Sequence, residues 1–229
     1  MRLIRSGASS PAFNLALDEA LLRSGEETLR LYAWDPPGLS LGYFQAAADF
    51  AVSPGFELVR RPTGGGAIAH CGELTIAWIG ARRRVDSVYA DINALVTQAV
   101  GRLGVRVEPG HGEPEAAPKG LCFDAYTAYD LMVGGRKLFG SAQRRGGDRF
   151  LCHGTLVLAP NPLAGGAISL EEALGRPVGR PEAERLVVEA ATEIWGAEPS
   201  DEPPTQAELA AAAALIKSRY GNQTWTYRR

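Results

Sequence analysis

The chain has 229 residues, 45% of them hydrophobic and 22% charged, and its formal net charge is −2. It is long enough to bury a hydrophobic core, and its charge balance excludes a globally basic protein of the kind that binds nucleic acid. The three cysteines form no CxxC pair, no apolar run reaches the roughly 20 residues that span a membrane, and MRLIRSGASS has no signal-peptide core. We therefore expect a cytoplasmic protein that binds neither nucleic acid nor a membrane.

The first half of the chain predicts one helix followed by strands. Ser10 and Pro11 are typical of a helix start, as cap and first helical residue, and Gly25 is typical of a helix end. Apolar runs then predict four strands, with DPPG as a turn between the first two. These runs are LRLYAW (29–34), LSLGYF (39–44), ELVRR (57–61) and ELTIAWIG (73–80).

The second half predicts a helix, a hairpin and a helical tail. Apolar residues recur at helical spacing over 86–103, whereas 109–120 has the glycine, proline and charge of a loop. In YDLMVGGRKLFGSAQ, Gly134-Gly135 predicts a two-residue turn between two strands. Another strand is predicted at 150–158, and helices are predicted at 181–195 and from a Thr205–Glu208 capping box to Arg219.

This order of elements predicts an α/β or α+β fold, with a mixed, largely antiparallel sheet flanked by helices. We expect one domain over residues 1–229. Within it, residues 165–229 are expected to be a small helical C-terminal portion, which leaves no room for a large accessory domain.

The stretch RRPTGGGAIAH (60–70) carries the first candidate binding site. Gly64–Gly66 have no side chains, so a ligand can lie against their N–H groups, and Arg60 and Arg61 add positive charge beside them. Guanidinium groups suit phosphate or carboxylate because they offer paired donors. The loop therefore predicts an anion site, and the alternative from the loop alone is a mobile hairpin tip with solvated arginines.

The lysine hairpin and the cysteine ahead of it carry the second candidate site. Lys137 follows the hairpin turn and can direct a cation at an acyl carbonyl or a phosphate. Cys122 ends the polar loop, and a cysteine near a lysine can act as an acyl acceptor. The alternatives are an exposed strand lysine and a small buried hydrophobe. The small residues Gly140, Ser141 and Ala142 follow the lysine, and small side chains here leave space for a large group to pass.

The pairs His70–Cys71 and Cys152–His153 do not predict a zinc site. Adjacent residues of a strand face opposite ways, so neither pair chelates one ion easily. We expect no metal–cysteine centre.

Taken in chain order, these stretches resemble the lipoate–protein ligase and octanoyltransferase family, which is related to the biotin ligases. The matching text runs from FNLALDEALL through LRLYAWDPPGLSLGYFQ, RRPTGGGAIAH, ELT and YDLMVGGRKLFGSAQRR to HGTLVL, and the ending YGNQTWTYRR is also similar. The resemblance implies a mixed sheet flanked by helices, with an acyl tunnel beside the glycine loop. It also implies that octanoyl or lipoyl groups are attached to one lysine of a lipoyl carrier domain.

The resemblance also implies roles for individual residues. Lys137 matches the family's lysine, which contacts the acyl carbonyl and the phosphate. Asp130 is a candidate to contact Mg²⁺ or to orient that lysine. The acyl and adenylate site is implied at Arg60, Arg61, Gly64, Gly65, Gly66, Ala67, His70, Gly140, Ser141, Ala142 and His153.

The family divides into two branches, and the chain has features of both. The ligases use ATP and free lipoate, and their loop commonly reads RR-x-x-GGGA, as at residues 60–67. The octanoyltransferases take octanoate from acyl carrier protein through a cysteine thioester, and Cys122-Phe123 fits the place of their cysteine. They commonly have arginine at the place of Gly66 and aspartate at that of Cys71. The gap at Gly66 favours a bulky phosphate ligand.

We therefore expect first a lipoate–protein ligase that uses ATP and Mg²⁺ to attach lipoate or octanoate through an acyl-adenylate. The first alternative is an octanoyltransferase with a Cys122 thioester and no cofactor beyond its acyl donor, octanoyl-acyl carrier protein. The second is a non-catalytic lipoate-binding or carrier-binding protein. The expected partner is a lipoyl carrier protein, either glycine-cleavage H-like or an E2-type lipoyl domain, and the need for an accessory polypeptide is open.

Overall fold

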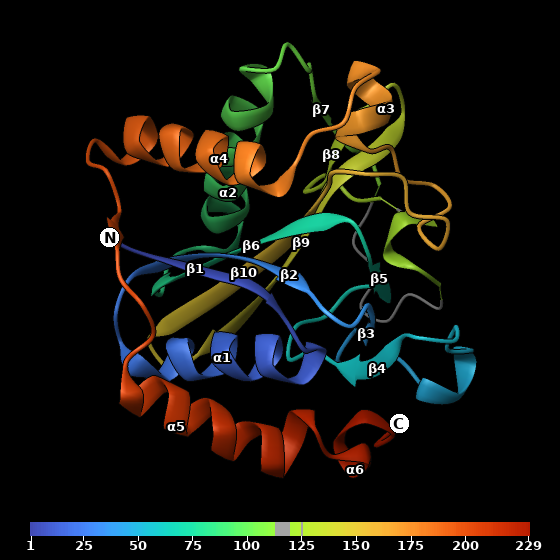
Figure 1. Cartoon of the computed structure of the whole chain (residues 1–229), viewed down its shortest axis with the longest axis vertical. Coiled ribbons are helices and arrows are strands. Elements are labelled where there is room, and N and C mark those ends of the chain that lie inside the picture. Colours follow the sequence, from blue (N-terminus) through green and yellow to red (C-terminus); the bar gives the residue numbers. More distant parts are fainter. Residues whose placement is uncertain (113–119, 125) are drawn as a thin grey trace.

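The computed structural model of the chain describes residues 1–112, 120–124 and 126–229, and has helices on both faces of a central sheet (Figure 1). The strands are β1 (Arg2–Ser9), β2 (Thr28–Trp34), β3 (Gly38–Leu41), β4 (Glu57–Arg60), β5 (Ile68–His70), β6 (Glu73–Ala81), β7 (Glu108–Pro109), β8 (Leu131–Val133), β9 (Arg136–Gly146), β10 (Arg149–Val157) and β11 (Ser200–Asp201). The helices are α1 (Pro11–Ser24), α2 (Val85–Gly101), α3 (Leu170–Leu174), α4 (Arg180–Trp195), α5 (Gln206–Leu215) and α6 (Gln223–Thr226).

The main sheet joins strands from the whole length of the chain. Over the described residues its order is β11-β1-β2-β6-β10-β9-β8-β7. β1 is parallel to both of its neighbours, and the other pairs are antiparallel. The register of β10 against β6 runs from Arg149 opposite Ala81 to Val157 opposite Glu73. The predicted mixed, largely antiparallel sheet is confirmed.

A second, smaller sheet lies beside the glycine loop. Its order is β4-β3-β5, with β3 parallel to β4 and antiparallel to β5. LRLYAW and LSLGYF, predicted as two strands around a turn, do form β2 and β3, but the two strands belong to different sheets. The sequence does not predict β1, because Arg5, Ser6 and Gly7 interrupt its apolar pattern. Pairing with β2 holds this strand in place.

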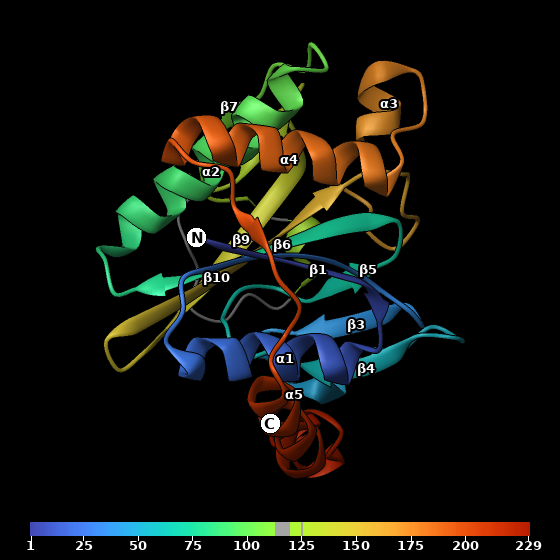
Figure 2. The same cartoon turned by 60° about the vertical axis from the view of Figure 1, so that its left-hand side comes forward.

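Apolar side chains alternate along β6 and build a core on each side of the main sheet. Leu74, Ile76 and Trp78 pack with α2 and α4, whereas Ala77 and Ile79 pack with α1 and α5. Because successive side chains of a strand point to opposite faces, a strand that is apolar throughout needs cover on both faces. Figures 1 and 2 show the two layers, with α2 and α4 above the sheet and α1 and α5 below it.

The helix ends follow the predicted sequence signals. α1 begins after Ser10, whose hydroxyl accepts a hydrogen bond from the Phe13 N–H, and it ends at Gly25 with a φ of 92°. α5 begins at the capping box in which the side chains of Thr205 and Glu208 each accept from the other residue's N–H. These predictions are confirmed, since the signals act within a few residues of the chain.

The C-terminal residues are distributed over the main sheet and both helical layers. β11 pairs with β1, α4 packs on α2, and α5 packs on α1. Residues 165–229 therefore complete the two helical layers. That the chain forms one domain over residues 1–229 stays a prediction.

The predicted loop at 109–120 falls largely outside the described residues, which omit 113–119. Its first residue, Pro109, pairs with Leu131 as the end of β7.

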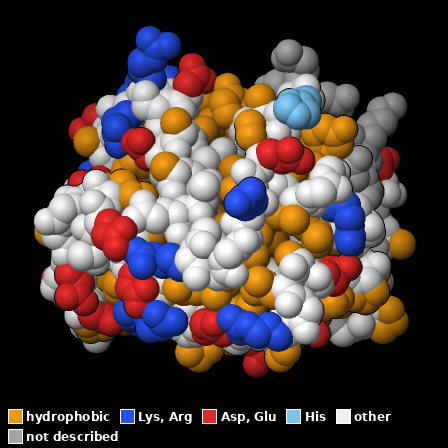
Figure 3. Space-filling view, turned by 90° about the horizontal axis from the view of Figure 1, so that it is seen from above, with side chains coloured by type: hydrophobic (Ala, Val, Ile, Leu, Met, Phe, Trp, Pro, Cys, Tyr) orange, Lys and Arg blue, Asp and Glu red, His pale blue; other side chains and the backbone are white. Residues whose placement is uncertain are grey.

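No helix in the described ranges is both long and apolar enough to cross a membrane. Seen from above, basic and acidic side chains are interspersed, and neither sign of charge gathers into a patch on that face (Figure 3).

Candidate active site

The lysine hairpin is built by β8 and β9. Gly134 and Gly135 have φ values of 57° and 76°, which a tight hairpin turn of the I′ kind requires. Lys137 follows as the second residue of β9, and its side chain is 2% exposed. Its Nζ lies 3.0 Å from Oδ2 of Asp130, which also accepts from the Thr127 N–H at 2.7 Å. Asp130 therefore holds and orients the lysine.

The same ammonium group lies beside Cys122. Lys137 Nζ donates to the carbonyl oxygen of Cys122 at 2.6 Å and lies 3.6 Å from its Sγ. A cation at this distance stabilises negative charge on sulfur, and the thiolate is the nucleophilic form of cysteine. The structure thus brings together the two residues that the sequence offers for catalysis.

The glycine loop holds the cysteine in place. The Cys122 N–H donates to the carbonyl of Ala67 at 2.7 Å, and the Ala67 N–H donates to the carbonyl of Gly120 at 3.2 Å. A Cβ placed on Gly66 would lie 2.9 Å from both Cα and N of Cys122. The gap at Gly66 is therefore filled by the chain's own backbone. The expectation that this gap admits a bulky phosphate is wrong.

Arg61 is buried and shapes the glycine loop from inside. Its guanidinium donates to the carbonyl oxygen of Ser40 at 2.8 Å and to those of Gly64 and Gly66 at 2.6 Å each. Burial lowers the pKa of Arg61 to about 10, and the charge of Cys122 acts in the opposite direction. Arg61 therefore stays protonated at neutral pH and adds a second cation on the cysteine's side of the loop.

Arg60 does not act at the glycine loop in the way that the sequence suggests. It is fully buried, and it donates to the carbonyl oxygens of Gly42, Gln45 and Thr226. These bonds occupy the guanidinium with backbone carbonyls and tie the loop after β3 to the C-terminal helix α6. Arg60 lines neither of the two cavities described below, and its role in the structure is to join these segments.

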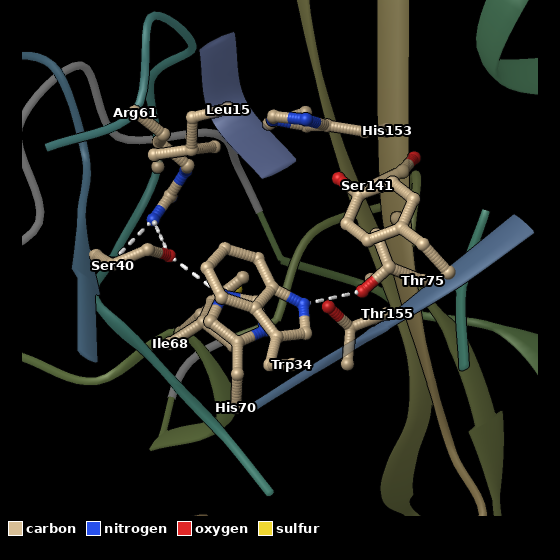
Figure 4. A pocket seen from close by; sticks show the side chains of 16 residues that line it. Leu15, Trp34, Ser40, Arg61, Ile68, His70, Thr75, Ser141, His153 and Thr155 are labelled. Carbon is tan, nitrogen blue, oxygen red and sulfur yellow. Dashed lines mark hydrogen bonds between the residues drawn. The ribbon is translucent and has the colours of Figure 1, made fainter. Parts of the chain in front are cut away.

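A narrow cavity lies where the main sheet meets the small sheet (Figure 4). Its empty space, with the part that is open to solvent included, is about 430 Å³. Side chains from α1, from both sheets and from the glycine loop surround it. The lining residues are Leu15, Tyr32, Trp34, Ser40, Arg61, Gly65, Ile68, His70, Thr75, Cys122, Gly140, Ser141, Ala142, His153, Gly154 and Thr155.

His70 lines this cavity with both ring nitrogens engaged. Its Nδ1 lies 2.9 Å from Oε1 of Glu73, and its Nε2 lies 2.8 Å from Oγ of Ser40. The ring stacks on Trp34 with centroids 3.7 Å apart, and Trp34 Nε1 donates to Thr75. Burial lowers the pKa of His70, although Glu73 acts to raise it. These contacts fix one wall of the cavity.

His153 is held in a similar way on the opposite side. Its Nδ1 lies 3.0 Å from Oδ2 of Asp18, and its Nε2 lies 2.7 Å from Oγ1 of Thr63. Asp18 is fully buried in α1 and also pairs with Arg30 at 2.6 Å. Burial acts to raise the pKa of Asp18, but Arg30 and His153 outweigh it and the pKa is lowered. Both predicted histidines therefore shape the site through fixed hydrogen bonds.

An open cleft meets the cavity at Cys122. The cleft contains Lys137 and Asp130, together with side chains of α2 and of the segment before β8. The residues that line both spaces are Gly65, Cys122, Ser141 and Ala142. Cys122 therefore lies where the narrow cavity meets the larger cleft.

The small residues after Lys137 leave room for the lysine itself. A Cβ on Gly140 would lie 3.0 Å from Oδ1 of Asp130 and 3.3 Å from Cδ of Lys137.

Sequence reasoning did not predict Ser40, Thr75 and Thr155, whose hydroxyl-bearing side chains line the cavity. A polar residue inside an otherwise apolar strand is the signal that marks these positions.

The described residues contain no group of three or more His, Cys, Asp or Glu side chains that could hold a metal ion. Cys71 is exposed and Cys152 is buried. Burial raises the pKa of Cys152 to about 12, so this thiol stays protonated at neutral pH. The contact between Asp130 and Mg²⁺ stays untested, whereas its contact with Lys137 is present.

Comparison with known proteins shows which family the chain belongs to. The lipoyl protein ligase A/B catalytic domain family matches residues 10–190 of the chain. The chain belongs to this family. It is therefore an enzyme of the group that transfers lipoyl or octanoyl groups, as its resemblance implies, and the predicted family is confirmed.

Curated relatives narrow the activity within the family. The chain is 33% identical over its full length to an octanoyltransferase LipM of Kyrpidia tusciae and covers 98% of it. It is 32% identical to an octanoyltransferase LipM of Symbiobacterium thermophilum, with the same coverage. These relatives contradict the ATP-dependent ligase that we expected first. That expectation rested on the RR-x-x-GGGA loop. In the structure, Arg60 donates to a backbone carbonyl and Gly66 lies against the backbone of Cys122.

Solved structures show the fold but do not separate the two branches. Protein Ta0514 from T. acidophilum matches with a TM-score of 0.86 and 23% identity, over 100% of this chain and 99% of that one. A lipoate-protein ligase A bound with ATP matches with a TM-score of 0.85 and 22% identity, over 99% and 98%. Similarity at this level of sequence identity shows a shared fold alone. The ATP bound in that structure is therefore no evidence that this chain binds ATP.

Proposed function

We propose that this protein is an octanoyltransferase. It moves an octanoyl group from a carrier-protein thioester to Cys122, and then to the acceptor lysine of a lipoyl carrier domain. The observation that carries this proposal is the Sγ of Cys122, 3.6 Å from the ammonium of Lys137, where the narrow cavity meets the cleft. A thioester donor is already activated, so the reaction needs no nucleotide and no metal.

In the first half-reaction the thiolate of Cys122 attacks the carbonyl carbon of the donor thioester. A new C–S bond forms, the bond to the donor's sulfur breaks, and that sulfur leaves as a thiolate. It takes a proton from the ammonium of Lys137, which becomes a neutral amine. The octanoyl chain lies in the apolar cavity, whose position next to Cys122 supports this arrangement.

In the second half-reaction the neutral amine of the acceptor lysine attacks the Cys122 thioester. The amide bond forms, the C–S bond breaks, and Cys122 leaves as a thiolate. The proton lost by the attacking nitrogen returns to Lys137 and restores its ion pair with Asp130. Lys137 thus carries one proton between the two half-reactions, and Asp130 stabilises its charged form.

The test is intact-mass spectrometry of the protein and of an apo lipoyl domain after incubation with octanoyl-acyl carrier protein. We expect an octanoyl adduct on the enzyme and then on the lipoyl domain, without ATP. Cys122→Ser abolishes both adducts and Lys137→Ala slows their formation by a factor of about 10²–10⁴. Cys71→Ser, at an exposed cysteine outside the site, retains both. Modification that requires ATP, or that persists in Cys122→Ser, would overturn the proposal.

A further inference from the structure

The C-terminal residues are hydrogen-bonded to segments beside the glycine loop. Arg60 donates to the carbonyl of Thr226, and Trp225 Nε1 donates back to the carbonyl of Arg60 at 2.9 Å. The Ala47 N–H donates to the carbonyl of Arg229 at 2.9 Å. These bonds attach the last residues of the chain to β4 and to the segment that follows β3. Figure 1 shows α6 and the chain end below β4.

This loop carries an exposed aromatic ring to the edge of the cleft. Phe44 is 47% exposed, and its ring lies 4.0 Å from where a Cβ of Gly64 would be, a residue that lines the cleft. The neighbouring Tyr43 N–H donates to the carbonyl of Thr63 at 2.8 Å. The aromatic pair is therefore fixed to the glycine loop, beside the entrance that leads to Cys122.

Three arginines surround this aromatic pair. Arg228 lies 3.8 Å from the centre of the Tyr43 ring, and Arg229 lies 5.6 Å from that of Phe44. Arg144 lies on β9 two residues after Ala142, which lines the cleft, and on the same face of the strand. A hydrogen bond from Arg228 lowers the pKa of Tyr43 against the effect of burial, and the charges of Arg144 and Arg229 act in the same direction. The charges of all three arginines therefore act on this ring.

These three residues, Arg144, Arg228 and Arg229, are called the cationic rim below. In the cluster at residues 82–84, Arg83 pairs with Asp91 at 2.8 Å and Arg84 with Asp86 at 3.8 Å. Within the described ranges, no carboxylate side chain pairs with any residue of the cationic rim. Its charge therefore remains available to a partner that approaches the cleft.

We propose that the cationic rim and Phe44 form the docking surface for the carrier protein that donates the acyl group. This inference rests on the proposed octanoyltransferase function. The donor's thioester hangs from a phosphodiester-linked arm, so an anion stands beside the carrier's surface when the thioester reaches Cys122. Guanidinium groups bind phosphate through paired donors, and an exposed aromatic ring gives the interface an apolar anchor.

The acceptor fits this surface less well than the donor. Its reacting group is a lysine amine, which is a cation until it loses a proton, and a cationic rim repels it over several ångströms. The rim therefore favours donor over acceptor during the first half-reaction. The two carriers use the cleft in turn, because each must reach Cys122.

The test compares two donors in a double variant, Arg144→Glu with Arg229→Glu. Arg228 is kept because it stacks between Tyr43 and Trp225. The donors are octanoyl-acyl carrier protein and octanoyl-pantetheine, which has neither protein nor phosphate. We expect kcat/KM for acylation of Cys122 to fall by about 10–100-fold with the carrier protein, mostly through KM, and by less than about 2-fold with octanoyl-pantetheine. The salt dependence of the carrier reaction also weakens.

The matched control is Arg176→Glu with Arg185→Glu, which makes the same charge change at exposed residues on the α4 side of the molecule, away from the cleft. It leaves both rates unchanged. Equal losses with both donors, or no loss with the carrier protein, would overturn the inference. A comparable fall in transfer from pre-acylated enzyme to the lipoyl domain would also overturn it. If the unmodified protein is acylated by neither donor, the proposed function itself fails.

Discussion

Gly66 provides a direct test of how the glycine loop serves the reaction. A methyl group there would meet Cα and N of Cys122 at 2.9 Å, which are backbone atoms that cannot rotate aside. We expect Gly66→Ala to displace the nucleophile and to lower the rate of Cys122 acylation by about 10²-fold, since an error of about 1 Å in position has effects of that size. Stopped reactions followed by intact mass measure this rate.

The neighbouring Gly64 supplies the comparison, because a Cβ there meets only the ring of Phe44, at 4.0 Å. Gly64→Ala should lose far less activity than Gly66→Ala. If both variants lose activity equally, the loop acts through contact with substrate rather than through the position of Cys122.

Asp130 is expected to act through the lysine it holds. Asp130→Asn keeps the shape of the side chain but leaves the 2%-exposed ammonium of Lys137 without its counter-charge. The lysine is then no longer held in place by the carboxylate, and it stabilises the thiolate of Cys122 less well. We expect both octanoyl transfer and the alkylation of Cys122 by iodoacetamide at pH 7 to slow by about 10-fold.

The control for this prediction is Asp148→Asn, in the exposed turn between β9 and β10. It should change neither rate. An Asp130→Asn protein that melts normally and whose Cys122 reacts at the original rate would show that the carboxylate does not orient Lys137.

At the level of whole elements, one buried ion pair joins β1 to α5. Arg2 donates to both carboxylate oxygens of Glu208, at 2.8 and 2.9 Å, and Glu208 also closes the capping box with Thr205. Burial acts to raise the pKa of Glu208, but the bonds from Arg2 and Thr205 outweigh it and lower the pKa to about 2. The folded state therefore favours the ionised carboxylate.

Because the folded pKa of Glu208 is depressed, its contribution is complete above the unfolded value near 4.5 and is lost as pH falls toward 2. We expect Glu208→Gln to lower the free energy of unfolding by about 2–3 kcal/mol at pH 7, and the difference from the original protein to shrink between about pH 4.5 and pH 2. Urea unfolding at several pH values measures both effects.

Glu198→Gln, at an exposed glutamate between α4 and β11, is the matched control and should leave stability unchanged. A Glu208→Gln penalty that stays constant down to pH 2 would mean that the pair with Arg2 contributes little, and that the loss comes from the cap alone.

For the molecule as a whole, the two core clusters share one sheet, so they should unfold together. Leu3 and Ile4 are adjacent in β1, yet they pack into the α2–α4 and the α1–α5 clusters respectively. We expect one thermal transition, with equal calorimetric and van't Hoff enthalpies. Differential scanning calorimetry measures both. Two transitions, or early loss of the C-terminal residues, would contradict the prediction of one domain over 1–229.

Much of this molecule follows from signals that act over a few residues. The cap at Ser10, the capping box at Thr205, the glycine turn before Lys137 and the alternation along β6 each predict an element that the structure contains. The order of the motifs along the chain also indicated the family, because a set of motifs in a fixed order is far more specific than any single motif. These signals are local, and local rules apply before the chain has folded.

The roles of the glycines and arginines depended on contacts between distant segments. From the sequence, RRPTGGG is typical of a phosphate site, since a pattern of side chains does not reveal what comes near them. In the structure, Arg60 binds Thr226, Arg61 binds the loop's own carbonyls, and Gly66 accommodates Cys122. Only the tertiary structure could decide this, because each partner comes from another part of the chain.

The sequence by itself therefore determined the elements, the family, and Cys122 and Lys137 as candidate catalytic residues. The tertiary structure decided that Sγ of Cys122 and Nζ of Lys137 lie 3.6 Å apart, with Asp130 paired to the lysine, where the narrow cavity meets the cleft. The physical reason is distance: a thiol and an amine can exchange a proton only when folding brings them together, and no spacing along the chain specifies that contact.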